Sequence, residues 1–259
     1  MTEATPLPAT LPEREGRPAL LIGPVMEAAH AALQPPGTTR WIVEVRTDRV
    51  ELRTAVRRWS TGAQPSAQLA RIACGSALRA ARLAVAVQGR RPLVSYSERP
   101  GLLAVLHAGL AVRPRPEEML MHRLLRHEIA PAWYRARLLD PLAALQRLRC
   151  AAEGDGAWVR VLSGPAPEGL GPSWQDEKAH DPIGDRRTIV ALVGAPGRLP
   201  AADLRVGQAI ETLQLTAMVL GLEMDVLAAP AEPAAAGLPR RLGGGAETNA
   251  IVRFGLPPP

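Results

Sequence analysis

The sequence predicts a mixed helix-and-strand protein in which one structural unit occurs twice. The segment ACGSALRAARLAVAVQGRRPLV, which begins at Ala73, resembles RVGQAIETLQLTAMVLGLEMDV, which begins at Arg205. Each copy reads as an apolar helix, a glycine stop and a strand. A helix, a loop and a strand headed by Trp41 or Trp158 precede the respective copies. These observations predict a duplicated unit of roughly helix–strand–helix–strand.

The two copies align with Gly75 opposite Gly207, a spacing of 132 residues. The helix of the second copy is apolar around most of its circumference, and a helix of that kind must be buried. We therefore expect the two repeat helices to pack on each other at the centre and form an intramolecular pseudo-dimer. Leu83 and Leu213 occupy this predicted seam, so a charge at either position is expected to unfold the protein.

The elements are predicted in chain order from apolar periodicity and from helix and turn signals. In the first half they are a helix from Pro18 to about Leu33, a hairpin over 41–52 that turns at Thr47-Asp48, the repeat helix over 68–88 with Gly89 as its stop, a strand over 92–96, a segment over 102–107 that fits strand or helix, and a helix that starts near Pro116. The apolar face of the first helix would comprise Leu21, Val25, Ala28, Ala29 and Ala32.

In the second half, Asp140 is a predicted helix cap and Pro141 the first helical residue. A strand over 157–162, a long loop over 163–187 and a buried strand over 188–194 are expected next. The second repeat helix is followed by predicted strands over 224–228 and 250–255. The domain prediction is a tail over 1–16, a first half over 17–139 and a second half over 140–259.

The composition predicts a globular protein with an aliphatic core. Its 259 residues are 47% hydrophobic and 22% charged, and only 3% are aromatic. Cys74 and Cys150 lie far apart, which is not a disulfide framework and favours a reducing compartment. The sequence has no apolar export segment and no apolar run long enough to cross a bilayer. A cytoplasmic protein with no membrane partner is the expectation.

The formal net charge of +6 comes almost wholly from arginine, and Lys178 is the single lysine. Such a surface can attract phosphates, nucleic acid or an anionic cofactor, although a GC-rich genome produces the same composition. The sequence lacks basic runs interleaved with aromatics and lacks zinc-finger or RNP-like spacing. It therefore does not favour a nucleic-acid partner. The histidines have no companions at metal-ligand spacing, and no metal site is predicted.

Four blocks in order carry a family resemblance: RIACGSALRAARLAVAVQGRRPLV, GLLAVLHAG, RVGQAIETLQLTAMVLGLEMDVL and NAIVRFG. Together they resemble the Acg-type branch of the nitroreductase-like flavoproteins over most of residues 18–256. The resemblance implies an α+β fold in which an antiparallel-rich sheet is flanked by helices and two homologous halves are fused in one chain. It also implies FMN at the interface of the halves and NAD(P)H-linked reduction of nitro or quinone compounds.

The resemblance places cofactor contacts in the loop before Trp41. The family reads approximately Ala-Pro-Ser-x-His-Asn-x-Gln-Pro-Trp there, whereas this chain reads LQPPGTTRW and keeps only the Trp. The positions carried over as cofactor-binding are Gln34, Thr38, Thr39 and Arg40, whose side chains offer hydrogen bonds or charge to a ribityl or phosphate group.

The family's basic cluster Arg-Arg-Thr-Asn-Arg aligns with RHEIA. Arg126 holds its first position and is the fifth predicted cofactor contact, whereas Ala130 replaces the final arginine and Glu128 adds a negative charge. Each charge-assisted hydrogen bond to a phosphate contributes about 1.5–3 kcal/mol, and micromolar binding amounts to about 8 kcal/mol. These departures therefore predict weakened FMN binding.

Two main hypotheses follow. In the first, the protein is an FMN-dependent NAD(P)H oxidoreductase for a small-molecule electron acceptor; the flavin does the chemistry and no catalytic amino acid is needed. In the second, the protein keeps the fold, has lost or weakened flavin binding, and binds a partner or sequesters a flat ligand. A third reading, a nucleic-acid-associated protein, rests on net charge alone. The chain would be a monomer with pseudo-dimeric halves or a homodimer.

Overall fold

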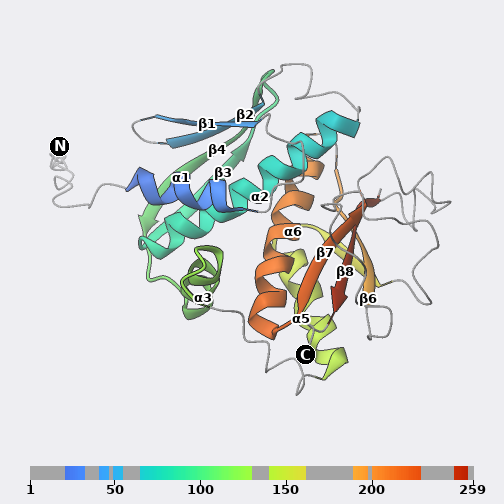
Figure 1. The fold of residues 1–259 in the computed structure, drawn as a ribbon. Coiled ribbons are helices and arrows are strands. Elements are labelled where there is room, and N and C mark those ends of the chain that lie inside the picture. The colour runs from blue at the N-terminus through green and yellow to red at the C-terminus, as the bar shows by residue number, and fades with distance from the viewer. Residues whose placement is uncertain are drawn as a thin grey trace, which may run out of the picture.

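The computed structural model describes residues 21–32, 41–46, 49–54, 65–129, 140–161, 189–197, 200–228 and 248–255 (Figure 1). Within these ranges the protein is α+β, with two four-stranded antiparallel sheets and helices packed beside them. The first set of elements is α1 (Ile22–Ala31), β1 (Trp41–Val45), β2 (Arg49–Thr54), α2 (Pro65–Val87), β3 (Arg90–Tyr96) and β4 (Leu102–Ala111). The second set is α5 (Pro141–Gly154), β5 (Trp158–Val161), β6 (Ile189–Gly194), α6 (Ala201–Leu220), β7 (Glu223–Ala228) and β8 (Thr248–Gly255), and α3 (Pro116–Leu125) lies between the sets.

The two sets have the same order of elements and the same sheet topology. Each reads helix, two strands, helix, two strands, and the sheet orders are β1-β2-β4-β3 and β5-β6-β8-β7. The predicted order of helix, strand, helix and strand is incomplete, because two strands stand in the structure where one was predicted. In the first set, the segment over 102–107 that fitted either strand or helix is part of β4, which pairs antiparallel with both β2 and β3.

Local sequence signals set most of the element boundaries. The predicted hairpin is confirmed, since β1 pairs antiparallel with β2 and Val45 lies opposite Val50. The Asp140 side chain accepts a hydrogen bond from the Leu142 backbone N–H at 3.1 Å, as expected of a helix cap. Gly89 and Gly221 follow the two repeat helices with φ of 74° and 76°, a left-handed conformation that glycine adopts without strain.

The start of the first helix differs from the prediction. Helix α1 begins at Ile22, and Leu21 is an extended cap residue whose exposed fraction is 64%. Gln88 holds Leu21 outside the helix, because its side-chain oxygen accepts from the Leu21 N–H at 2.7 Å and its amide donates to the Leu21 carbonyl at 3.0 Å. The other predicted members of the apolar face are buried: Val25, Ala28, Ala29 and Ala32.

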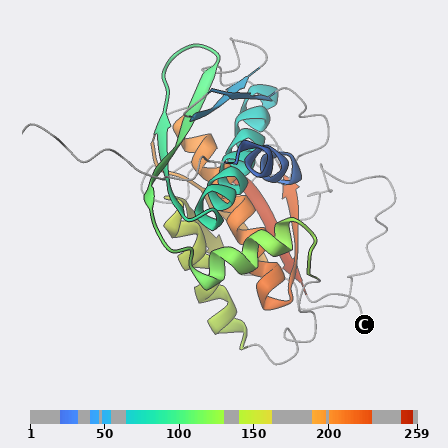
Figure 2. The ribbon, with the colours of Figure 1, turned by 90° about the vertical axis from the view of Figure 1, so that its left-hand side faces the viewer.

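Helices α2 and α6 cross at the centre of the molecule with their backbones in close contact (Figures 1 and 2). A Cβ atom on Gly75 would collide with the Leu204 carbonyl oxygen and the Gly207 Cα, and a Cβ on Gly207 would collide with the Ile72 carbonyl oxygen and the Gly75 Cα. Ile72 and Leu204 are themselves related by the spacing of 132 that relates the glycines. The predicted packing of the two repeat helices is therefore confirmed.

Each set of elements has its own apolar core, and the crossing helices exchange residues between the two cores. Ile72 of α2 packs into the core around α5, α6, β6 and β8, whereas Leu204 of α6 packs into the core around α1, α2, β2 and β4. Leu83 and Leu213 are fully buried, as predicted. In the part of the chain that the structure describes, no helix combines the length and the apolar character needed to cross a membrane.

Candidate functional site

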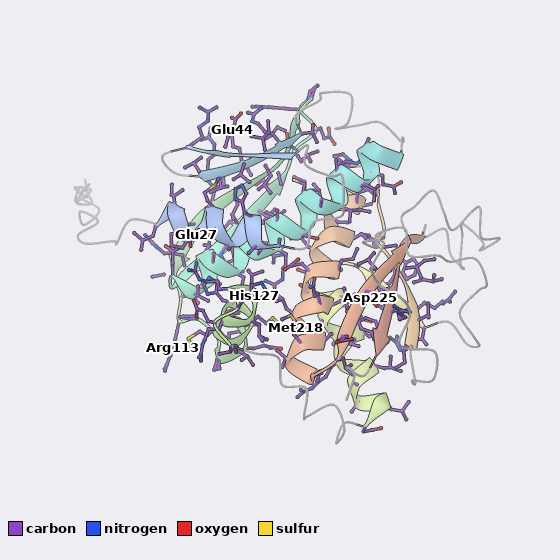
Figure 3. The ribbon with its side chains drawn as sticks, in the orientation of Figure 1. Glu27, Glu44, Arg113, His127, Met218 and Asp225 are labelled. Carbon is purple, nitrogen blue, oxygen red and sulfur yellow. The ribbon has the colours of Figure 1, made fainter. Side chains whose placement is uncertain are left out.

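Four of the five predicted cofactor contacts, Gln34, Thr38, Thr39 and Arg40, lie outside the described residues. The fifth, Arg126, is the C-cap of α3. Its Nη1 donates to the Glu27 carboxylate on α1 at 2.7 Å, and its Nε donates to the Glu128 carboxylate at 3.0 Å. Figure 3 labels Glu27 on α1 and His127, the residue after Arg126, near the end of α3.

These contacts determine the electrostatics of Arg126. Hydrogen bonds to Glu27 and Glu128 raise the pKa of the Arg126 guanidinium above its ordinary value. The positive charge of Arg126, which would attract a phosphate, is therefore already paired with two carboxylates. His122, one turn earlier on α3, has a lowered pKa because burial and then the charge of Arg126 disfavour its protonated form.

A groove lies beside the Pro116–Met121 part of α3, where helices of both sets meet. Its floor is one face of α6, joined in the smaller hollow by Arg79, Arg82 and Ala86 of α2, and α3 and α5 form its walls. It consists of two adjoining hollows of about 320 and 660 Å³, sizes within the range of roughly 300–1,000 Å³ usual for small-molecule sites. The main lining residues are Thr212, Thr216, Val219 and Leu220 from α6, Pro116, Glu117, Leu120 and Met121 from α3, and Gln146, Arg147, Cys150 and Ala151 from α5.

The smaller hollow is polar and centres on Asp155, which follows α5. Arg82 donates from Nη1 to one Asp155 oxygen at 2.9 Å, and the Thr212 hydroxyl donates to the other. Arg79 Nε donates to Thr212 Oγ1 at 2.6 Å and lies 3.5 Å from the same carboxylate. Burial lowers the pKa of Arg79, and Asp155 opposes that shift. The cluster thus joins α2 to the second set of elements.

The hydrogen-bond network continues from this cluster to the first sheet. Arg82 Nη1 also donates to the Gln208 side-chain oxygen at 2.6 Å, and the Gln208 amide donates to the Tyr96 hydroxyl at 2.9 Å. The Arg205 guanidinium lies over the Tyr96 ring, 5.6 Å from its centre. Side chains from α2, α6, β3 and the α5–β5 connection therefore act as one polar unit.

The charged residues that line the smaller hollow balance one another. Three cationic side chains face three anionic ones, and the Glu118 carboxylate is already bound to the Arg115 backbone N–H at 2.7 Å. A ligand dianion would gain no net charge attraction there. The cations are Arg79, Arg82 and Arg115, and the anions are Glu117, Glu118 and Asp155.

The larger hollow is mainly apolar, with Leu120, Val219 and Leu220 among its lining residues. Thr216 also lines it, and its exposed fraction is 6%. Among the residues that the structure describes, the Thr216 hydroxyl has no hydrogen-bond partner. The exposed Cys150 thiol borders both hollows.

The surroundings of the cysteines limit thiol chemistry, and the positions of the possible ligands limit metal binding. Both cysteines are free, and burial raises the pKa of the Cys74 thiol far above its ordinary value, so this residue is an unreactive part of the core. Across the described ranges, no three His, Cys, Asp or Glu side chains gather closely enough to hold a metal ion.

The groove was missed at the sequence level, although two signals for it were present. Arg79 and Arg82 are one helical turn apart on α2, and Thr212 and Thr216 stand at i and i+4 on the largely buried α6. A polar stripe on a helix that is buried all round indicates internal partners or a ligand.

Comparison with known proteins gives no family assignment. No protein-family model matches the sequence, and none of the curated proteins matches it either.

Proposed function

We propose that the chain has a nitroreductase-like fold in which two homologous halves form an intramolecular pseudo-dimer. In this proposal the protein binds a flat ring ligand at the junction of the halves and holds the phosphate of FMN only weakly. The weak binding of the phosphate is inferred from the ion pairs that Arg126 forms with Glu27 and Glu128. It favours a binding or sequestering role over a flavoenzyme.

The like arrangement of the two sets supports the pseudo-dimer. Equal strand orders and reciprocal contacts of Gly75 and Gly207 are what a duplicated and fused unit would produce. The junction is also where a ligand would contact both halves. The groove lies there, with walls from α3 and α5 and a floor from α6.

The described residues do not fit the phosphate of FMN. A phosphate dianion is best held by free arginine forks. Arg126 is paired with two carboxylates, and Arg79 and Arg82 share Asp155 inside a hollow whose charged lining residues balance. At either place a phosphate would have to share guanidinium groups that carboxylates already engage. The ring of a flavin carries no such requirement.

The second candidate is an FMN-dependent NAD(P)H oxidoreductase that reduces nitro or quinone compounds. It is favoured by the position of the groove between helices of both halves, where a ring would be shielded from water. FMN, when bound, would supply the hydride chemistry, and this chain would bind and orient it.

Titration with FMN and with riboflavin separates the two candidates, because the ligands share the ring and differ in the phosphate. The proposal predicts equal affinities within about threefold, and no NAD(P)H oxidation with menadione or a nitrofuran. FMN binding at least tenfold tighter than riboflavin, with a flavin spectrum and NAD(P)H turnover, would establish the oxidoreductase instead.

A gain-of-function variant tests the role of Arg126 directly. The double substitution Glu27→Gln and Glu128→Gln frees the Arg126 guanidinium for a charge-assisted hydrogen bond to a phosphate, so FMN affinity should rise relative to riboflavin affinity. Glu44→Gln is the matched control, because Glu44 is an ion-paired carboxylate on β1 and lies far from His127, the neighbour of Arg126 in the chain (Figure 3). If the ratio of FMN affinity to riboflavin affinity is unchanged in the double variant, Arg126 does not limit phosphate binding.

A further inference from the structure

We infer that one end of the first set of elements is a peripheral contact surface for a bilayer that contains anionic phospholipids. This hairpin-end surface comprises Leu21, Arg91, Leu110, Val112 and Arg113. It goes beyond the proposed function, because none of its residues lines the groove. The expectation of no membrane partner rested on export and spanning segments, and a peripheral surface requires neither.

Backbone pairing and hydrogen bonds bring the parts of the hairpin-end surface together. The Gln88 side chain, just after α2, binds both backbone groups of Leu21, and the residue after Gln88 accepts from the Val112 N–H at 2.8 Å. The start of β3 pairs with the end of β4, which places Arg91 beside Leu110. The start of α1, the end of α2 and the end of β4 therefore lie on the same side of the molecule (Figure 1).

Three aliphatic side chains of this surface are largely in contact with solvent. The exposed fraction is 64% for Leu21, 67% for Leu110 and 48% for Val112. They stand at a helix start and a strand end and line neither hollow of the groove. A peptide partner would need a groove or pockets for its side chains, whereas aliphatic side chains that stand out from the surface suit the boundary between the headgroups and acyl chains of a bilayer.

Leu21 occupies a position where leucine does not stabilise the fold. It is the N-cap of α1, with φ of −76° and ψ of 107°, and a leucine side chain cannot accept the hydrogen bond that a cap residue accepts. Asp140 is the N-cap of α5 in nearly the same backbone conformation, with φ of −66° and ψ of 120°, and it does accept that bond. The stability of α1 therefore does not explain an exposed leucine at this position, whereas contact with an apolar partner does.

Arginines beside these aliphatic residues supply the attraction to anionic headgroups. Arg91 and Arg113 are exposed, and neither forms an ion pair with any of the described residues; Figure 3 labels Arg113. Guanidinium groups bind phosphate through paired hydrogen bonds. Glu98, the single acidic residue between 89 and 116, lies at the other end of the hairpin. The charge is particular to the first set, because Glu223 of β7 stands 132 residues after Arg91, at the equivalent position.

Sedimentation of the full chain with lipid vesicles tests the inference. The chain should bind vesicles of equimolar phosphatidylcholine and phosphatidylglycerol at least roughly fivefold more tightly than vesicles of phosphatidylcholine alone. Arg91→Gln combined with Arg113→Gln should weaken binding to the anionic vesicles roughly tenfold. Arg99→Gln combined with Arg149→Gln is the matched control, because it removes the same charge from exposed positions at the other end of the hairpin and on α5, and it should change the affinity less than about twofold.

Two leucine variants test the apolar part of the surface. Leu110→Ser should weaken binding to the anionic vesicles at least roughly fivefold, whereas Leu142→Ser, at a more exposed leucine on α5, should leave it unchanged. Leu21→Asn places a favourable N-cap residue on α1 without adding charge, so it should raise the melting temperature and weaken vesicle binding. Because this variant gains stability, its loss of binding cannot arise from unfolding.

The inference is overturned if the chain does not sediment with the anionic vesicles, or if the leucine and arginine variants bind them as the original protein does. Equal binding to polyglutamate or DNA, lost in the arginine variant and kept in Leu110→Ser, would identify a general polyanion surface and exclude the bilayer. None of these measurements depends on riboflavin or FMN, so this inference and the proposed function can fail separately.

Discussion

The facing helices α2 and α6 are alike where they cross and unlike one turn later. At the crossing, Gly75 and Gly207 make reciprocal backbone contacts at equivalent positions. One and two turns further on, α2 carries Arg79 and Arg82, and the equivalent positions of α6 carry Glu211 and Gln214. The packing of the junction is therefore symmetric while its chemistry is not, and the guanidinium groups reach Asp155 from one side.

The largest expected effect comes from placing a charge in the shared packing. Leu213→Asp, like Leu83→Asp in the facing helix, buries an unpaired carboxylate at a fully buried site and should lower the free energy of unfolding by more than about 5 kcal/mol, comparable with the whole stability of a domain. Circular dichroism should show an unfolded chain. Leu142→Asp, 75% exposed, should stay within about 0.5 kcal/mol of the original protein. A folded Leu213→Asp protein would contradict the buried crossing.

The second-largest expected effect tests the Asp155 cluster, which makes the chemistry of the junction asymmetric. Asp155→Asn keeps the shape but removes the carboxylate that Arg79, Arg82 and Thr212 share, and urea unfolding should show a loss of about 1.5–3 kcal/mol. Asp225→Asn, whose side chain is 51% exposed in its pair with Arg253, should cost about 0–1 kcal/mol. Equal losses at the two positions would mean that the Asp155 cluster does not stabilise the junction.

A smaller effect tests the symmetric crossing. Gly207→Ala and Gly75→Ala each place a methyl group against the backbone of the facing helix, and each should cost about 1–3 kcal/mol. Gly154→Ala is the control, because a Cβ there meets nothing within 4 Å and alanine favours helix. In thermal unfolding, Gly207→Ala and Gly75→Ala should both lower the melting temperature, and Gly154→Ala should not. A loss at one crossing glycine but not at the other would break the equivalence of the helices.

The smallest effect lies on the first sheet, away from the junction. Hydrogen bonds from Arg49 and then Arg53 lower the pKa of Glu51 below the ordinary value of a glutamate. A lowered pKa contributes stability that is present above about pH 4.5 and is lost as the pH falls through the lower value of the folded state. Glu51→Gln should flatten this acid limb and leave the junction variants unaffected. An identical acid limb in Glu51→Gln would remove Glu51 as its cause.

Local and repeated features of the fold could be predicted from the sequence. The cap at Asp140, the left-handed glycines after both repeat helices and the hairpin from Trp41 follow from rules that act over a few residues. The internal repeat also predicted that α2 and α6 pack together. Long-range pairings could not be predicted, because the strand order in each sheet is set by contacts between distant segments.

The candidate site was predicted less well than the fold. The groove takes its walls from α3 and α5 and its floor from α6, and no short motif joins these segments. Whether Arg126 is free depends on Glu27, which lies 99 residues away in the chain. The charge of a position can be predicted from the sequence, but its partner depends on the folded structure.

The most direct test of the central claim is the coupling between Arg71 and Asp203. These residues hold equivalent positions on α2 and α6, are fully buried, and form an ion pair at 2.8 Å. A double-mutant cycle with Arg71→Ala, Asp203→Ala and the double variant should give a coupling energy of about 1.5–3 kcal/mol in urea unfolding. Additivity within about 0.5 kcal/mol would contradict the pairing of the two helices at the centre of the molecule.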